Sequence, residues 1–338
     1  MQSFIKKVES GSDLSRQEAE LAMEEILSGR SDEETIVSFL TALRAKGETV
    51  AELVGFARAM RRHSTPVFAD GSRPDALLVD TCGTGGDSSG TFNISTAAAF
   101  VAAGAGVHIA KHGNRSISSK CGSADVLEAL GVSLDVPPES VGVAIHKIGI
   151  GFLFAPALHT AMRHAMPARR RLGRTVFNLL GPLTNPAGAR AQVAGVFSDQ
   201  VVEKVALVLS ELDVERAFVV HGAGGLDEIS LSGETTVGDV HRGAVRIYQV
   251  TPEDFGLERA PLETISGGDA TQNAAHIRAI LSGEPGPRRN IVVANAAAAI
   301  VASGRAADFL EGAQLAAASI DSGEASKKLD SLIEISHT

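Results

Sequence analysis

Two polar segments that contain glycine carry the side chains best suited to bind an anion. The first, DTCGTGGD at 80–87, follows the apolar run 77–79, and the second, KHGNRS at 111–116, follows the apolar run 107–110. Glycine lets backbone N–H groups approach a phosphate closely, and the N-terminus of a following helix adds a favourable dipole. The alanine-rich stretch 93–104 is such a helix, which we expect to be capped by its first asparagine or serine and closed by its last glycine. The pattern predicts a phosphate site.

The glycine spacing excludes two common nucleotide motifs. Gly83, Gly85 and Gly86 lack the G-x-G-x-x-G spacing, and no Gly-Lys-Ser/Thr sequence closes a Walker-type loop. Taken alone, the first segment also fits a plain turn between a strand and a helix. Lys111 and Arg115 in the second segment favour a ligand, because charged side chains after a buried strand are costly unless they meet a partner.

A pair of adjacent carboxylates, Asp227 and Glu228, follows the predicted strand 217–221 and the glycine turn 222–225. Carboxylate oxygens of this kind suit Mg²⁺, which also bridges to substrate phosphates. The alternative is an ordinary acidic turn in water. The sequence contains no histidine and cysteine cluster with zinc spacing.

Arginines gather between residues 163 and 174, and most are expected on a solvated helix face. One of them could hold a carboxylate through two parallel hydrogen bonds.

The surrounding pattern predicts an α/β protein, with a small all-helical domain and a large α/β domain whose mainly parallel central sheet is covered by helices. Residues 1–65 form helices, with capping boxes at Ser15 and Glu18, Ser31 and Glu34, and Thr49 and Glu52. A linker over 64–76 leads to alternating strands and helices. Beyond the strands that precede the two polar segments, we expect strands at 151–154, 192–197, 217–221 and within 235–250, and helices at 156–180, 201–212, 270–282, 290–303, 306–319 and 323–335.

Composition limits the partners and the compartment. The chain has 338 residues, which suits two unequal domains, and a net charge of −9, which argues against a broad surface for nucleic acid or anionic membrane. No apolar run approaches a membrane span, no signal sequence is evident, and the two cysteines are expected to be reduced thiols in the cytoplasm.

Five motifs in collinear order together resemble the anthranilate phosphoribosyltransferase family. They are GTGGD (83–87), FNIST (92–96), KHGNRSISSKCGSADVLEALG (111–131), RTVFNLLGPLTNP (174–186) and HGAGGLDEISL (221–231). Cysteine at 82 and 121 and serine at 88 depart from the residues usual in that family.

The resemblance implies transfer of 5-phosphoribosyl from phosphoribosyl pyrophosphate to the amino group of anthranilate, in tryptophan biosynthesis, with Mg²⁺ as cofactor. It implies that phosphoribosyl pyrophosphate is bound by Gly83, Thr84, Gly85, Gly86, Asp87, Asn93, Ser95, Thr96, Lys111, Ser119, Cys121, Gly122 and Ser123. It implies that anthranilate is bound by Gly83, His112, Asn114, His159 and Arg169, and the metal by Ser95, Asp227 and Glu228. We expect catalysis by positioning and electrostatics, with no residue assigned as acid or base.

The same resemblance implies domain boundaries and an assembly. The small domain covers residues 1–70 and is completed by helices around 163–185, the large domain covers 71–338, and two copies form a homodimer through the helical domain. Two rival functions are a pyrimidine nucleoside phosphorylase and a nucleic-acid-binding relative without catalysis. The sequence Val79-Asp80-Thr81-Cys82 counts against the first, and the negative charge and the intact acidic pair count against the second.

Cys82 and Cys121 fall one in each polar segment. If the segments converge on one ligand, alkylation of the thiols should inactivate the protein and phosphoribosyl pyrophosphate should protect it. The alternative is that both are small buried residues that do not react.

Overall fold

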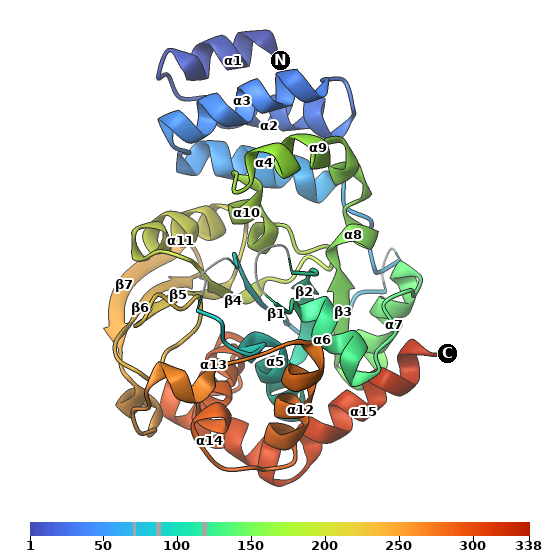
Figure 1. Ribbon diagram of the computed structural model, residues 1–338, viewed down its shortest axis with the longest axis vertical. Helices are drawn as coiled ribbons and strands as arrows, with labels where there is room; N and C mark the ends of the chain where they lie inside the picture. Colours follow the sequence, from blue (N-terminus) through green and yellow to red (C-terminus); the bar gives the residue numbers. More distant parts are fainter. Residues whose placement is uncertain (70–71, 86–88, 117–119) are drawn as a thin grey trace.

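The computed structural model describes residues 1–69, 72–85, 89–116 and 120–338 (Figure 1). Four helices form a bundle at one end: α1 (Gln2–Glu9), α2 (Arg16–Leu27), α3 (Glu33–Lys46) and α4 (Val50–Arg62). The capping boxes at Ser15 and Thr49 are confirmed. The one predicted at Ser31 is wrong, because α3 begins one residue later and Asp32 accepts the hydrogen bond from the Thr35 N–H at 2.9 Å.

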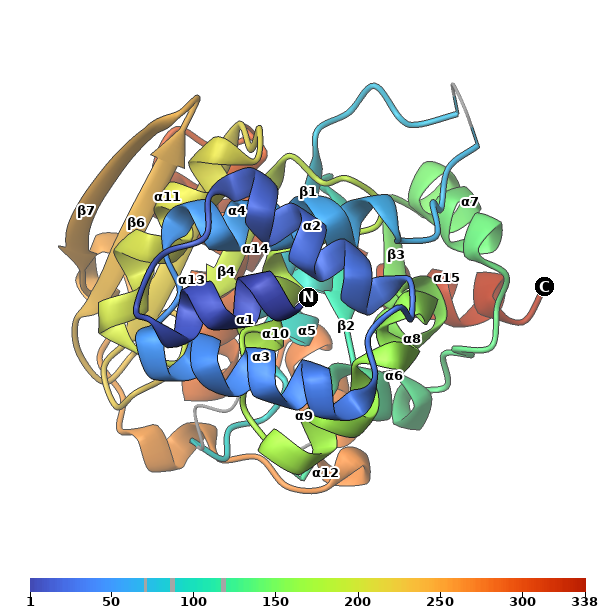
Figure 2. The same ribbon diagram turned by 90° about the horizontal axis from the view of Figure 1, so that it is seen from above.

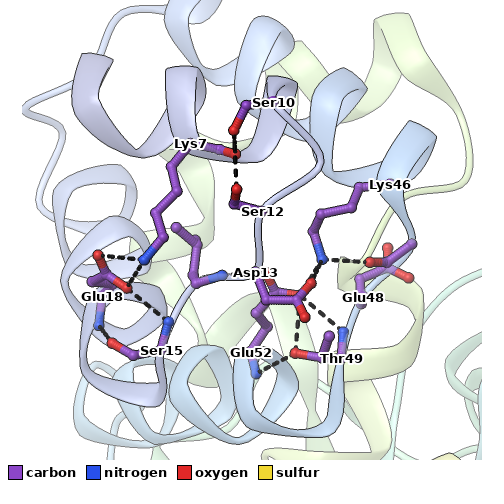
Figure 3. A network of polar contacts seen from close by, with 12 residues as sticks. Lys7, Ser10, Ser12, Asp13, Ser15, Glu18, Lys46, Glu48, Thr49 and Glu52 are labelled. Carbon is purple, nitrogen blue, oxygen red and sulfur yellow. Dashed lines mark hydrogen bonds and ion pairs between the residues drawn. The ribbon is translucent and has the colours of Figure 1, made fainter.

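A buried carboxylate joins three parts of the bundle (Figure 3). Glu52 in α4 has no exposed surface. It accepts hydrogen bonds from the Leu14 N–H at 2.9 Å, from the Lys46 ammonium at 3.0 Å and from the Thr49 N–H at 2.8 Å. Since a buried charge is tolerated only when it is paired and hydrogen-bonded, this side chain ties α3, α4 and the segment before α2 together.

A seven-stranded sheet forms the centre of the rest of the chain, which confirms the predicted fold class. Its strands are β1 (Leu78–Gly83), β2 (His108–Gly113), β3 (Ile150–Phe154), β4 (Ala191–Gly195), β5 (Arg216–Gly222), β6 (Thr235–His241) and β7 (Ala244–Val250). The spatial order is β3-β2-β1-β4-β5-β6-β7, with β1 to β5 parallel and the last two strands antiparallel. The carboxyl ends of β1 to β5 therefore lie along one edge, where ligands bind in open α/β sheets.

Helices cover both faces of the sheet because its strands are apolar on both sides. One face packs on α5 (Ile94–Gly104) and α13 (Pro287–Ala302), with α6 (Ser123–Leu130), α12 (Ala270–Leu281), α14 (Phe309–Asp321) and α15 (Glu324–Ser336) around them. The other face packs on α7 (Pro138–Ile148) and α11 (Val202–Glu211). Seen from the bundle end, α1 to α4 lie above the middle of the sheet, between β7 on one side and α15 on the other (Figure 2).

The segment after β3 returns to the bundle in short pieces, so the predicted continuous helix over 156–180 is wrong. It contains α8 (Ala155–Leu158), the 3₁₀ turn Thr160–His164, α9 (Met166–Leu172), α10 (Phe177–Leu180) and the 3₁₀ turn Gly181–Leu183. Gly173 adopts φ +72°, a left-handed conformation that ends α9. Apolar residues between 165 and 183 share one buried cluster with α1 to α4, and that cluster continues into α11 and the sheet.

Two strands extend further than the sequence predicted. β1 includes Asp80, Thr81 and Cys82, and β2 includes Lys111 and His112, all expected in loops. Most of these residues are polar, and for that reason the sequence pattern predicted that the strands end before them. In the structure they are buried within the sheet, where polar partners meet them. No helix in the described part of the chain is both long and apolar enough to cross a membrane.

Candidate active site

Three segments at the carboxyl edge of the sheet meet through backbone hydrogen bonds to an acidic pair. The Gly85 N–H, just after β1, donates to Asp227 at 3.0 Å. The Ser95 N–H, in the first turn of α5, donates to Glu228 at 3.1 Å. The turn after β5 therefore lies directly against the first polar loop and the start of the helix that follows it.

Lys111 lies beneath this junction. It is a buried strand residue, 4% exposed, and not the loop residue that the sequence pattern predicted. Its ammonium donates to the Thr81 carbonyl and to Ser95 Oγ, the latter at 3.3 Å. Burial lowers the pKa of Lys111, and the charge of Asp80 is the largest effect opposing it. A cation is thus held where the first loop, α5 and β2 converge.

Asp80 and Asn185 were missed as site-forming residues. Asp80 is fully buried and accepts hydrogen bonds from the His112 N–H at 2.9 Å and from Asn185 Nδ2 at 2.7 Å. Asn185 also donates to the Ala110 carbonyl at 2.8 Å. The paired residues of β1 and β2 end at Val79, so these side chains fill the space where the two strands separate. The signal that could have identified Asp80 was an aspartate that directly follows an apolar strand segment.

The start of α5 differs from the expected cap. Asn93 is the N-cap residue but makes no side-chain cap bond, because its amide bridges to the second loop and to α12. It donates to the Cys121 carbonyl at 3.2 Å and accepts from Asn273 at 3.0 Å. Ser95 lies inside the helix. The hydroxyl of Thr96 is buried and has no hydrogen-bond partner among the described residues.

The second loop folds back on the N-terminus of α6. The Asn114 N–H and carbonyl both contact Ser123 Oγ at 3.2 Å. Asp125 accepts from the Ser116 N–H at 3.1 Å and from the Gly122 N–H at 2.8 Å. A Cβ on Gly122 would lie 2.3 Å from Ser116 N, so only glycine fits this close approach.

Thr84 is held by the end of β4. Its N–H donates to the Gly195 carbonyl at 2.8 Å, and its hydroxyl accepts from the Phe197 N–H at 3.2 Å. A Cβ on Gly83 would lie 2.8 Å from Asp227 Oδ2, so this glycine makes room for the acidic pair. Gly86, Asp87 and Ser119, which complete the predicted set, lie outside the described residues.

Two buried imidazoles from different elements face each other. The ring centroids of His112 in β2 and His159 after α8 are 5.1 Å apart. Burial, reinforced in His112 by the second ring, lowers the pKa of His112 to about 3, and burial lowers that of His159 to about 4. Both rings are therefore neutral near pH 7, and among the described residues the Nε2 atom of each has no hydrogen-bond partner.

The arginines between residues 163 and 174 differ in how far their side chains are buried. Arg169 in α9 is half-buried over the ring of Phe177, 5.4 Å from its centroid, and burial lowers its pKa. No described carboxylate forms an ion pair with it, whereas Arg171 in the same helix pairs with Glu34. Arg170 is exposed. Arg174 stacks on Phe197 at 4.0 Å and donates to the Gly85 carbonyl at 3.2 Å, so it contacts the first loop.

Both thiols are buried and weakly acidic. Cys82 accepts a hydrogen bond from Gln192 at 2.9 Å, and burial together with Asp80 raises its pKa well above the usual range. Burial raises the pKa of Cys121 to about 11, and this thiol donates to Asn93 Oδ1 at 3.4 Å. The thiolate is the reactive form, so this geometry favours the alternative in which neither cysteine reacts.

Family models match both parts of the chain. Residues 75–326 match the glycosyl transferase family, a/b domain, and residues 2–64 match the helical bundle domain of the glycosyl transferase family. Anthranilate phosphoribosyltransferase of Symbiobacterium thermophilum is 54% identical over 338 residues, covering 100% of this chain and 98% of that protein. The enzyme of the same name from Pelotomaculum thermopropionicum is 55% identical over 335 residues, covering 99% and 96%.

Solved structures agree in fold over the same length. Anthranilate phosphoribosyltransferase from Thermus thermophilus superposes with a TM-score of 0.93 at 46% identity, covering 99% of each chain. The Saccharomyces cerevisiae enzyme, in complex with phosphoribosyl pyrophosphate and Mg, superposes with a TM-score of 0.89 at 31% identity, covering 99% of this chain and 97% of that one. By sequence over its whole length and by fold, the chain belongs to the anthranilate phosphoribosyltransferases of this glycosyltransferase family.

Proposed function

We propose that this protein transfers the 5-phosphoribosyl group of phosphoribosyl pyrophosphate to the amino group of anthranilate, in tryptophan biosynthesis. The products are N-(5-phosphoribosyl)anthranilate and pyrophosphate. The observation that carries the proposal is the junction of Lys111, the Ser95 amide and Glu228, since it combines a buried cation, an N–H donor and a carboxylate at one point.

The diphosphate side of the substrate belongs at the first loop and the start of α5. The Gly85 and Ser95 amides and the Lys111 ammonium are donors that suit phosphate oxygens. The buried, unpartnered hydroxyl of Thr96 is a further donor at the same helix terminus. In this proposal the second loop, with Cys121, Gly122 and Ser123, closes over the phosphoribosyl group.

Anthranilate belongs beside the two imidazoles and the half-buried arginine. A neutral imidazole can hydrogen-bond an aromatic amine without adding charge, and Asn114 can orient the amine from the second loop. The Arg169 guanidinium suits the substrate carboxylate because it has no carboxylate partner in the described protein. Arg170 is exposed and is the weaker candidate.

The acidic pair fits Mg²⁺. Among the described residues no group of three or more histidine, cysteine, aspartate or glutamate side chains surrounds a common point. Mg²⁺ is usually bound by one or two carboxylates together with substrate phosphates, and Asp227, Glu228 and the Ser95 hydroxyl offer such a partial set. When bound, the ion supplies positive charge to the departing pyrophosphate.

The residues of the site act by position and charge. An aromatic amine is nucleophilic without deprotonation, so the protein has to hold it near the anomeric carbon and stabilise the leaving group. Lys111 and the loop amides provide that stabilisation, and the neutral histidines orient the amine.

Loss of anthranilate fluorescence tests the reaction. We expect turnover of anthranilate with phosphoribosyl pyrophosphate and Mg²⁺, and no release of free base from a pyrimidine nucleoside in phosphate, followed by ultraviolet absorbance. The reverse result, or activity with neither pair, contradicts the proposed function.

We also propose the organisation implied by the family. Residues 1–70, completed by helices around 163–185, form the small domain, residues 71–338 form the large one, and two copies associate through the helical domain in the cytoplasm. The packing of α9 on α3 and of α10 on α4 supports the assignment of this returning segment to the small domain. Sedimentation of the whole chain and of a variant with charged residues on the bundle surface tests the assembly.

A further inference from the structure

Two hydrogen bonds join the acidic pair to the first polar loop and to the start of α5. Gly85 and Ser95 are amide donors of the proposed diphosphate site, and each is directed at a carboxylate of the pair. Asp227 takes the Gly85 N–H at 3.0 Å and Glu228 takes the Ser95 N–H at 3.1 Å. The chain's own anions therefore occupy donors that substrate oxygens would need.

The backbone that carries the pair is fixed. A Cβ on Gly195 would lie 1.6 Å from the Asp227 carbonyl oxygen, so this backbone is wedged against β4. Leu226 and Ile229, which flank the pair, are buried, and the Ile229 N–H donates to Asn295 at 2.9 Å. A ligand can free the amides only if the two side chains turn, because the turn itself has no room to move.

We propose that the two carboxylates mask the diphosphate site, so that it accepts the diphosphate only together with a divalent cation. This inference rests on the proposed function. With a cation present, the Asp227 and Glu228 carboxylates turn from the Gly85 and Ser95 amides to the ion, and the freed N–H groups receive phosphate oxygens. The pair thus selects the form of the substrate as well as holding the metal.

The physical reason is competition for the same donors. A diphosphate without metal has to displace two charge-assisted hydrogen bonds and then lie beside two like charges. Each displaced bond reduces its affinity roughly 10- to 100-fold. Lys111 is the buried cation at this junction, and it also contacts Ser95 Oγ. Cation and diphosphate must then raise each other's affinity by equal factors.

Calorimetric titration with inorganic pyrophosphate, in EDTA and in Mg²⁺, separates masking from simple metal binding. For the wild type we expect weak binding in EDTA and binding at least roughly tenfold tighter in Mg²⁺. In Asp227→Asn and in Glu228→Gln we expect binding in EDTA to become tighter than in wild type, by about tenfold, while the gain from Mg²⁺ shrinks. A residue that only binds metal leaves the EDTA value unchanged.

Glu263→Gln is the matched control. This exposed carboxylate follows Leu262, whose side chain lies against Gly224 of the glycine turn, so the variant removes one negative charge without freeing either amide. We expect it to bind pyrophosphate like the wild type. An equal tightening in Glu263→Gln shows a general charge effect and overturns the masking proposal.

Hydrogen exchange gives a second readout that needs no turnover. Mg²⁺ alone should increase exchange at the Gly85 and Ser95 amides of the wild type, because their acceptors turn away. Unchanged exchange with Mg²⁺, or metal-independent pyrophosphate binding in the wild type, overturns the inference and leaves the proposed function standing. Absence of pyrophosphate binding under every condition contradicts the proposed function itself.

Discussion

Carboxylates serve two different purposes in the helical bundle, where Glu52 is buried, and at the edge of the sheet, where Asp227 and Glu228 are partly exposed. Glu52 accepts from fixed partners on three segments of the bundle and has no exposed surface (Figure 3). Asp227 and Glu228 accept from the Gly85 amide of the first loop and the Ser95 amide of α5, both proposed to bind substrate. The two cases differ in whether a ligand can replace the carboxylate as the acceptor of these hydrogen bonds.

The largest expected effect is on catalysis, at the edge of the sheet. The double variant Asp227→Asn, Glu228→Gln should lose about 3 kcal/mol or more of transition-state stabilisation, measured as a fall in kcat/KM. The reason is that the leaving pyrophosphate loses the positive charge that the metal supplies. The melting temperature should stay near that of the wild type. Glu228→Gln alone should move the Mg²⁺ dependence of the initial rate to higher concentration. Overlapping Mg²⁺ titrations at equal maximal rates would contradict the metal assignment.

In the bundle we expect a loss of stability and no loss of catalysis. Glu52→Gln places an amide N–H₂ among donors and should reduce the free energy of unfolding by about 3 kcal/mol, while kcat per folded molecule is unchanged. Urea unfolding followed by circular dichroism measures the loss. Glu9→Gln, on the exposed end of α1, is the control and should be neutral. A fall in kcat without loss of stability would remove the distinction drawn between the two regions.

Arg169 tests whether an unpaired, half-buried charge marks the aromatic half of the site. Arg169→Ala should raise the KM for anthranilate by roughly 10- to 150-fold, equivalent to about 1.5–3 kcal/mol, and affect phosphoribosyl pyrophosphate far less. Arg170→Ala is the matched control because that side chain is exposed. Equal effects on both substrates, or a larger effect at Arg170, refute the assignment.

The paired imidazoles predict a dependence of stability on pH. Burial holds the pKa of His112 at about 3 and that of His159 at about 4, below the value near 6.5 of an unfolded chain. The unfolded state therefore binds more protons between pH 6.5 and 4, and stability falls as the pH falls through that window. Each histidine contributes a slope of up to about 1.4 kcal/mol per pH unit.

Replacement of either ring isolates that slope. His112→Asn and His159→Asn should each flatten the acid side of the stability curve, measured by urea unfolding at pH 4.5, 5.5 and 6.5. His241→Asn, at an exposed position, should leave the slope unchanged. Parallel curves for all three variants would show that the imidazoles are not held neutral.

The smallest expected effect concerns the thiols. Alkylating reagents should leave native activity unchanged for both cysteines, since burial keeps Cys82 and Cys121 protonated. Mass spectrometry of the native and the urea-unfolded protein measures the modification. Rapid inactivation that phosphoribosyl pyrophosphate prevents would contradict this expectation and would show that the thiols lie next to the ligand.

The sequence by itself determined the alternation of strands and helices after a helical N-terminal part, the capping boxes at Ser15 and Thr49, and the motifs of the family. These depend on residues close together in the chain, where spacing and side-chain type carry the information. Burial is set by contacts between distant segments, so only the tertiary structure decided that Lys111 is a strand residue and that Asp80 binds Asn185. The same holds for the two carboxylates that occupy the loop amides, because their donors lie more than 130 residues away along the chain.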